Sequence, residues 1–331
     1  MRTITLRRSL VALFAAAISF GAITQAQAAS QDKSVLRIGY QKYGTLVLLK
    51  ARGTLEKRLA DQGIEVKWTE FPGGPQLLEG LNVGSIDFGT TGEAPPIFAQ
   101  AAGADLLYVA HEPPAPTSEA ILVPKDSPLT AVADLKGKRI ALNKGSNVHY
   151  LLVRALEEAG LTYSDIQPVY LPPADARAAF ERGSVDAWVI WDPFQAAAEN
   201  QLQARTLRNG QGLVNNHQFY LATKAYAVKN PHVVQVLIDE IRGIGQWTKE
   251  NSAAATAQVA PLLGLSADIT RVAVERQRYG AQLIGPEVIE AQQRIADTFS
   301  DLNLIPKRLV IKDVVWSAPT QAAPAKVATA Q

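Results

Sequence analysis

The sequence contains no cysteine, so neither disulfide bonds nor thiol chemistry is available to the protein. Only four histidines are present, at positions 111, 149, 217 and 232, and their wide spacing is not that of a metal site. The chain also has no large net charge, because it contains 33 basic and 31 acidic residues. These absences exclude a disulfide framework and argue against a basic nucleic-acid-binding surface. We expect no metal and no cofactor.

The first 28 residues have the three parts of a secretory signal peptide. Arg2, Arg7 and Arg8 supply a basic start, residues 10–23 form an apolar run, and Ala26-Gln27-Ala28 is a small-residue cleavage motif. The apolar run is short for a membrane-spanning helix, which makes a retained anchor the weaker alternative. We therefore predict cleavage after Ala28 and a periplasmic protein, with 30 basic and 31 acidic residues remaining.

Two stretches about 100 residues apart repeat the same order of patterns. In both, an apolar strand pattern is followed by a glycine-containing loop, a helical pattern, a second strand pattern and a second helical pattern. Each then reaches Gly-Ser-x-Asp, at residues 84–87 and 183–186, and a third strand pattern. Strands alternating with such helices are typical of parallel sheets with right-handed crossovers. The repeat predicts two α/β lobes of similar design, with one doubly wound sheet as the alternative.

Apolar spacing supports the repeated helices. Residues 48, 51, 55 and 59 share one face of a helix that we expect to run to Gln62, and residues 151–159 repeat this spacing. Residues 220–316 are mostly helical in pattern. We expect the chain to return to its first lobe after completing the second. The predicted limits are 29–115 plus 219–316 for lobe one, 116–218 for lobe two, hinges near 113–118 and 209–219, and a disordered tail at 317–331.

Ligands of open α/β sheets bind beyond the carboxyl ends of the strands, where two pairs of loops match. The first pair, residues 41–45 and 144–147, places a hydroxyl residue after a glycine at each helix start. Thr45 and Ser146 are N-cap candidates, and free backbone N–H groups there would bind an anion. Simple capping without a ligand is the alternative. The ligand contacts that we predict in these loops are Gln41, Gly44, Thr45, Ser146 and Asn147.

The second pair of loops follows the Gly-Ser-x-Asp strands. Thr91 and Gly92 offer a hydroxyl and a backbone that a ligand can approach closely, and Trp191 could form an apolar wall or belong to the core. We interpret Glu93 and Asp192 as helix N-terminal partners or ligand acceptors. A general acid/base pair is the weaker interpretation, because no nucleophile or metal set accompanies them.

An arginine fork would suit a sulfonate, phosphate or carboxylate. The segment Arg276-Gln277-Arg278-Tyr279 contains two, and we predict that Arg276 faces the cleft, with Arg278 as the alternative. Asn216 lies at the second expected hinge and could donate to a ligand, although a role in the hinge would explain it equally well.

Longer motifs make the chain recognisable. Those on which the recognition rests are residues 37–42, Glu70-Phe71-Pro72-Gly73-Gly74-Pro75-Gln76, residues 82–87, Thr91-Gly92-Glu93, residues 99–108, residues 133–137, Lys144-Gly145-Ser146, residues 173–177 and 186–193. In this order they are similar to the aliphatic sulfonate-binding proteins of ABC importers. The similarity covers nearly the whole mature chain and is strongest from Val35 to Asp192.

The resemblance implies a type II periplasmic binding fold, in which two Rossmann-like lobes close about a two-segment hinge. It implies partners, namely a membrane permease and its ATPase, while the chain itself is expected to be a monomer. It also implies capture of an alkanesulfonate for sulfur acquisition, with taurine, nitrate or a thiamine precursor as alternatives. The cleft residues that it implies are Gln41, Thr91, Gly92, Glu93, Ser146, Trp191, Asp192 and Arg276.

An enzyme is the alternative from another class. A sulfinate-cleaving desulfinase resembles the same family, but its nucleophile is a cysteine, which this chain lacks. Ser146 would have to replace it, with His149 as base on the same helical face. No third orienting group is evident, so we expect a binding protein in which His149 lies beside the ligand. A pure protein-interaction module would explain the repeat but not the matched anion loops.

Overall fold

The computed structural model describes residues 34–318. The predicted signal peptide, residues 1–28, lies outside this range, as do residues 319–331 of the predicted tail. Within the described range, no helix is both long enough and apolar enough to cross a membrane. The same residues include no group of three or more histidine, cysteine, aspartate or glutamate side chains that could hold a metal ion.

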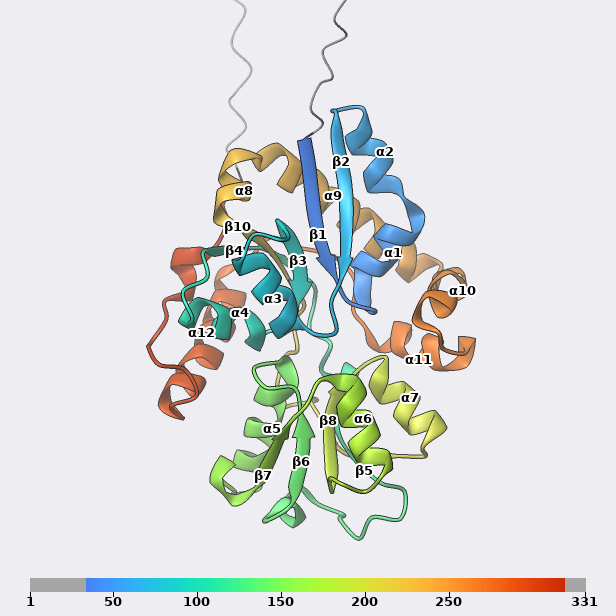
Figure 1. Cartoon of the computed structure of the whole chain (residues 1–331), viewed down its shortest axis with the longest axis vertical. Coiled ribbons are helices and arrows are strands. Elements are labelled where there is room, and N and C mark those ends of the chain that lie inside the picture. Colours follow the sequence, from blue (N-terminus) through green and yellow to red (C-terminus); the bar gives the residue numbers. More distant parts are fainter. Residues whose placement is uncertain (1–33, 319–331) are drawn as a thin grey trace, which may run out of the picture. The chain divides into compact units, whose positions relative to one another are not determined.

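Within residues 34–318, ten strands form two separate sheets of five, which excludes the single-sheet alternative. The first sheet has the order β2-β1-β3-β10-β4 and the second β7-β6-β8-β5-β9. Both belong to one compact unit of the chain (Figure 1). The first sheet contains β1 (Ser34–Tyr40), β2 (Ile64–Glu70), β3 (Phe88–Thr91), β4 (Leu106–His111) and β10 (Phe219–Thr223). The second contains β5 (Glu119–Val123), β6 (Arg139–Leu142), β7 (Gln167–Tyr170), β8 (Ala187–Trp191) and β9 (Arg205–Asn209).

The sheets are mixed rather than wholly parallel. The repeated strands pair in parallel, β1 with β2 and β3, and β6 with β7 and β8. One antiparallel strand enters each sheet at the same place, β10 beside β3 and β5 beside β8. These two strands are the ones that follow the connections between the sheets. The repeat therefore predicts three strands of each sheet correctly and does not describe the other two, which are the antiparallel strand and the strand beyond it, β4 or β9.

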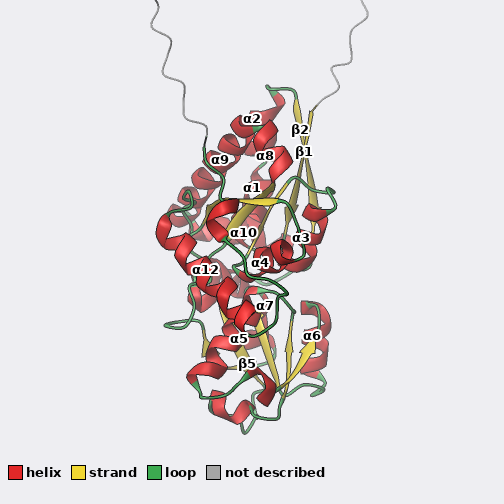
Figure 2. Ribbon diagram, turned by 90° about the vertical axis from the view of Figure 1, so that its left-hand side faces the viewer, coloured by secondary structure: helices red, strands yellow, loops and turns green. Residues whose placement is uncertain are grey.

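Helices cover both faces of the first sheet (Figure 2). Along β10, Phe219 and Leu221 pack with α3 and α4, whereas Tyr220 and Ala222 pack with α1 and α9. The first lobe carries α1 (Gly44–Arg52), α2 (Thr54–Ala60), α3 (Gly74–Asn82), α4 (Ala94–Ala101), α8 (Lys224–Lys229), α9 (Pro231–Glu250), α10 (Ser252–Leu263), α11 (Ala267–Arg276) and α12 (Pro286–Asp301). The second lobe carries α5 (Asn147–Glu158), α6 (Pro173–Glu181) and α7 (Phe194–Gln201).

The long helix expected from Leu48 to Gln62 is two helices, so this prediction is wrong. Gly53 separates α1 from α2 with a left-handed φ of 61°, a conformation that glycine adopts without steric cost. Ala51, which the spacing predicts on the apolar face, is exposed.

The Gly-Ser-x-Asp repeat has a structural explanation. Asp87 forms an ion pair with Arg37 of β1 at 2.6 Å, and Asp186 forms the equivalent pair with Arg139 of β6 at 3.1 Å. Each aspartate also accepts the backbone N–H of its arginine. The motif therefore fixes the start of the third strand against the first in both lobes.

Two connecting segments join the lobes, and they lie side by side. Residues 112–118 link β4 to β5, and residues 210–218 link β9 to β10. Glu112 N–H donates to the Gln218 carbonyl at 2.8 Å, and Ala115 N–H donates to the Asn215 carbonyl at 3.0 Å. These pairings place the connections where the sequence predicts the hinges.

Candidate functional site

The loops that follow the parallel strands of one lobe meet those of the other. A Cβ atom added to Gly73 would lie 2.7 Å from the side-chain nitrogen of Asn143, and one added to Gly145 would lie 3.3 Å from the ring of Phe98. Gly73 and Phe98 belong to the first lobe, and Asn143 and Gly145 belong to the second. The starts of α3, α4 and α5 are therefore in close contact across the lobe boundary.

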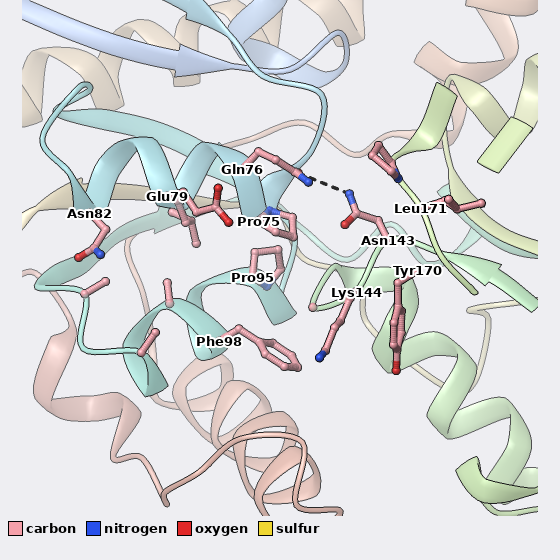
Figure 3. A pocket seen from close by; sticks show the side chains of 16 residues that line it. Pro75, Gln76, Glu79, Asn82, Pro95, Phe98, Asn143, Lys144, Tyr170 and Leu171 are labelled. Carbon is pink, nitrogen blue, oxygen red and sulfur yellow. Dashed lines mark hydrogen bonds between the residues drawn. The ribbon is translucent and has the colours of Figure 1, made fainter. Parts of the chain in front are cut away.

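A groove of about 430 Å³ opens at this boundary, which is a usual size for a small-molecule site. Its polar side chains include Gln76, Glu79, Asn143 and Lys144 (Figure 3). The Nδ2 atom of Asn143 donates to Oε1 of Gln76 at 3.5 Å and so bridges the lobes. The walls are apolar and include Pro95, Phe98, Tyr170 and Leu171.

A second, much smaller cavity lies between α1, α10, α11 and the loop after β8. It measures about 20 Å³, roughly the space of one water molecule. Gly44 and Asp192 line it together with Tyr43 and Gln277. Two of the loops predicted from the sequence therefore meet at a small cavity, whose volume in this structure is less than that of a sulfonate.

Helices α3, α4, α5 and α6 begin at the groove without a hydrogen bond from their N-cap side chain, and α1 and α7 begin at the second cavity in the same way. Within residues 34–318, α8 and α11 are the helices whose N-cap side chain, Thr223 and Ser266, accepts a backbone N–H. Uncapped N-termini present backbone N–H groups and the positive end of the helix dipole. The arrangement therefore favours an anion at the boundary.

The first predicted loop is buried and its side chains are bonded within the lobe. Gln41 donates from Nε2 to the Thr90 carbonyl at 3.0 Å. The prediction that Thr45 is the N-cap of α1 is wrong, because Tyr43 holds that position and Gly44 begins the helix. The Thr45 hydroxyl instead donates to Oε1 of Glu112 at 2.8 Å.

Ser146 does hold the N-cap position of α5, but its hydroxyl makes no capping bond. It donates to the Asn143 carbonyl at 2.7 Å and so fixes the residue that lines the groove. The next residue, Asn147, is buried and donates from Nδ2 to Glu119 and, at 3.2 Å, to Asn216. Hydrogen bonds to Asn143, Glu119 and Asn216 thereby hold the loop in place.

His149 is fully buried among the aromatic rings of both lobes, including Phe98, Phe299 and Tyr163. Its Nδ1 atom accepts the Gly145 N–H at 3.2 Å. Burial lowers the pKa of this imidazole to about 4. His149 and the Ser146 hydroxyl therefore bond to different backbone groups.

Glu93 is also buried, at the N-cap position of α4. Its Oε1 atom accepts the backbone N–H of His217 at 2.9 Å, which links α4 to the second connection. Burial raises the pKa of the Glu93 carboxyl to about 7. The neighbouring Thr91 hydroxyl donates to the Gly92 carbonyl at 2.9 Å. These groups hold the boundary together and do not line the groove.

The last predicted residues lie on the α7 side of the boundary or at the hinge. Trp191 is 5% exposed and packs edge-on against Phe194. Asp192 accepts the Ala196 N–H at 3.0 Å, as expected of a helix N-terminal partner, and burial raises its pKa to about 7. Arg276 pairs with this aspartate.

Asn216 belongs to the second connection and donates to the Ala115 carbonyl and to the Ser118 hydroxyl, both at 3.0 Å. It therefore ties the two connections together, in keeping with the alternative that the sequence left open.

None of the thirteen predicted side chains lines the groove. The groove residues Gln76, Phe98, Asn143, Lys144 and Tyr170 are not among the predicted ligand contacts, although Lys144 belongs to the predicted loop 144–147. One available signal was the Gly73-Gly74-Pro75 segment after β2, because glycines before a helix mark a close approach. Gly74 indeed begins α3 against Pro95, where an added Cβ atom would lie 2.8 Å from the proline ring.

Comparison with known proteins identifies the family to which the chain is related. A family model described as NMT1/THI5 like matches residues 59–254. A protein of Escherichia coli K12 named as an aliphatic sulfonates-binding protein is 47% identical over 300 residues, which cover 90% of this chain and 93% of that protein.

Two solved structures are similar over most of both chains. The alkanesulfonate-binding protein SsuA from Xanthomonas axonopodis pv. citri, bound to MOPS, is 46% identical with a TM-score of 0.83, covering 86% of this chain and 98% of that one. The periplasmic aliphatic sulphonate binding protein SsuA from Escherichia coli is 46% identical with a TM-score of 0.79, covering 88% and 94%. The predicted fold class is thereby confirmed.

Proposed function

Because this chain belongs to the NMT1/THI5-like family and to its aliphatic sulfonate-binding proteins, we propose that it captures an alkanesulfonate between its lobes for an ABC importer. The observation that carries the proposal is the convergence of the uncapped N-termini of α3, α4, α5 and α6 beside a groove of about 430 Å³. A sulfonate keeps one negative charge at any ordinary pH. Its site therefore needs hydrogen-bond donors and no base.

We place the headgroup among Gln76, Asn143 and Lys144. The two amides come from opposite lobes and lie 3.5 Å apart, so one anion could accept bonds from both. The Lys144 ammonium, 5.2 Å from the centre of the Tyr170 ring, supplies a charge at the same groove. The N-termini of α3 and α5 add their dipoles. A ligand held this way favours the closed arrangement of the lobes.

The alkyl tail lies along the apolar walls, against Pro95, Phe98, Tyr170 and Leu171. Burial of each methylene group contributes about 0.8 kcal/mol, so affinity should rise with tail length until the groove is filled. The thirteen residues predicted from the sequence as ligand contacts do not line this groove and remain a separate proposal for the ligand. They are Gln41, Gly44, Thr45, Thr91, Gly92, Glu93, Ser146, Asn147, His149, Trp191, Asp192, Asn216 and Arg276.

The proposal is for binding without catalysis. The Ser146 hydroxyl donates to the Asn143 carbonyl, and His149 accepts from Gly145, so the two side chains do not form a nucleophile–base pair. We place the lobes at 29–115 plus 219–316 and at 116–218, with both connections as the hinge. Export through the N-terminal signal, cleavage after Ala28 and delivery to a membrane permease and its ATPase complete the proposed role. The SsuA protein of Escherichia coli is a periplasmic binding protein.

A thermal-shift screen of the purified chain from residue 29 tests the function. It compares alkanesulfonates of increasing length with taurine, sulfate, nitrate, phosphate and a thiamine precursor. A ligand at 100 times its Kd stabilises the folded state by about 2.7 kcal/mol. Selective stabilisation by alkanesulfonates is the expected result. A shift with nitrate or the precursor alone would replace the substrate, and no shift with any of them would contradict the function.

A further inference from the structure

One helix of each lobe forms a contact outside the groove. Ala196 and Ala197 of α7 pack against Ile269 and Ala273 of α11 in a small apolar cluster. None of these four residues lines the groove. The contact therefore joins the lobes at a place that the ligand does not touch in the proposed site.

An arginine extends this contact. Arg276, the last residue of α11, places Nη2 at 2.7 Å from Oε2 of Glu199 and Nη1 at 3.5 Å from Oδ1 of Asp192. The Arg276 side chain is 26% exposed and the Asp192 side chain only 1%. A guanidinium from the first lobe thus pairs with two carboxylates of the second.

Both carboxylates are held by their own lobe. Asp192 accepts the Ala196 N–H at 3.0 Å, and Oε1 of Glu199 accepts from Gln195 at 3.1 Å and from Thr206 at 2.8 Å. These bonds leave Oε2 of Glu199 for the arginine. The acceptor side of the pair is therefore arranged within the second lobe, and only the arginine has to arrive when the lobes close.

We propose that Arg276 is a positioning residue for ligand capture, acting through Glu199 and Asp192 as an ion-pair latch of the closed lobes. The inference rests on the proposed function and differs from the headgroup contact expected from the sequence. A latch of this kind stabilises the closed state whichever ligand is bound. Its loss should weaken every ligand by the same factor, and the factor should shrink as salt screens the pair.

The test uses Glu199→Gln, which removes one charge of the latch without touching the groove. Isothermal titration with methanesulfonate and hexanesulfonate should show both ligands weakened by a common factor of about 2- to 10-fold. Arg276→Ala should weaken binding at least as much, and adding Glu199→Gln to it should change little. Arg271→Ala is the matched control, because Arg271 forms an exposed pair with Glu275 on the same helix. Small-angle scattering without ligand should show a larger radius of gyration for Glu199→Gln than for the unaltered chain.

Two results would overturn the latch. Unchanged affinity in Glu199→Gln together with a large loss in Arg276→Ala would assign Arg276 to the ligand itself. Equal radii of gyration for Glu199→Gln and the unaltered chain would show that the pair does not hold the lobes. If the unaltered chain bound no alkanesulfonate, the proposed function would fail, and the scattering comparison would still decide the latch.

Discussion

Gly92 of the first lobe lies directly against Asn147 of the second, and a Cβ atom added to Gly92 would stand 2.7 Å from the Cβ of Asn147. Carbon atoms of two residues do not approach so closely, so one of them would have to move. Asn147 is held by Glu119 and Asn216 and cannot move freely. The close approach of the two lobes therefore depends on the absence of a side chain at residue 92.

Replacement of Gly92 by alanine should keep the lobes from closing fully. Forcing one methyl group into a packed contact costs about 1–3 kcal/mol, which we expect as a roughly 5- to 150-fold weaker affinity for hexanesulfonate. Isothermal titration measures it. Gly243→Ala is the control, since a Cβ atom added to Gly243 inside α9 would meet nothing within 4 Å. Equal affinities for the two variants would contradict a closing role for Gly92.

The part of the fold that could be predicted from the sequence is the pattern that occurs in both lobes. The Gly-Ser-x-Asp motifs, their helices and the parallel strands recur along the chain, because each lobe satisfies the same packing and the same arginine–aspartate pair. The antiparallel strands β5 and β10 are not part of the repeated pattern, since each follows a connection from the other lobe. A local sequence pattern does not indicate where the chain passes from one lobe to the other.

The candidate site was predictable only to the level of its loops. Lys144 belongs to the predicted loop 144–147 and Asn143 directly precedes it, but their position in the groove depends on α3 and α4 of the other lobe. The role of Trp191 could not be predicted from its residue type alone, because a tryptophan at the end of a strand can line a ligand site or pack in the core. The structure buries it to 5% exposure, and its contact with a ligand tail stays a prediction.

Tyr170 gives a test of the apolar wall. The residue is 41% exposed and lines the groove, so Tyr170→Ala should leave the free energy of unfolding nearly unchanged. Affinity for methanesulfonate should stay the same, while the gain for each added methylene group should fall below about 0.8 kcal/mol. Titration with methane-, butane-, hexane- and octanesulfonate measures this slope. Val310→Ala, at a 51% exposed site outside the groove, serves as the control. The wall assignment fails if the slope survives in Tyr170→Ala.

The buried carboxyl of Glu93 predicts a pH dependence of stability. Burial raises its pKa from 4.5 to about 7, so the folded state binds a proton that the unfolded chain has already lost. Its contribution to stability is full below pH 4.5 and is lost as pH rises through 7. Between pH 5.5 and 8.5, the free energy of unfolding of the unaltered chain should therefore fall by about 2 kcal/mol relative to that of Glu93→Gln.

Comparison with the variant isolates Glu93 from groups of opposite sign. Burial lowers the pKa values of His111, His149 and His217, so these residues destabilise the fold as pH falls, but they act equally in both proteins. Chemical denaturation at four pH values between 5.5 and 8.5 supplies the measurement. Glu290→Gln, at an exposed site, should keep a constant difference from the unaltered chain. If the difference for Glu93→Gln were equally constant, the carboxyl would not be held in the buried, proton-binding position at the lobe boundary.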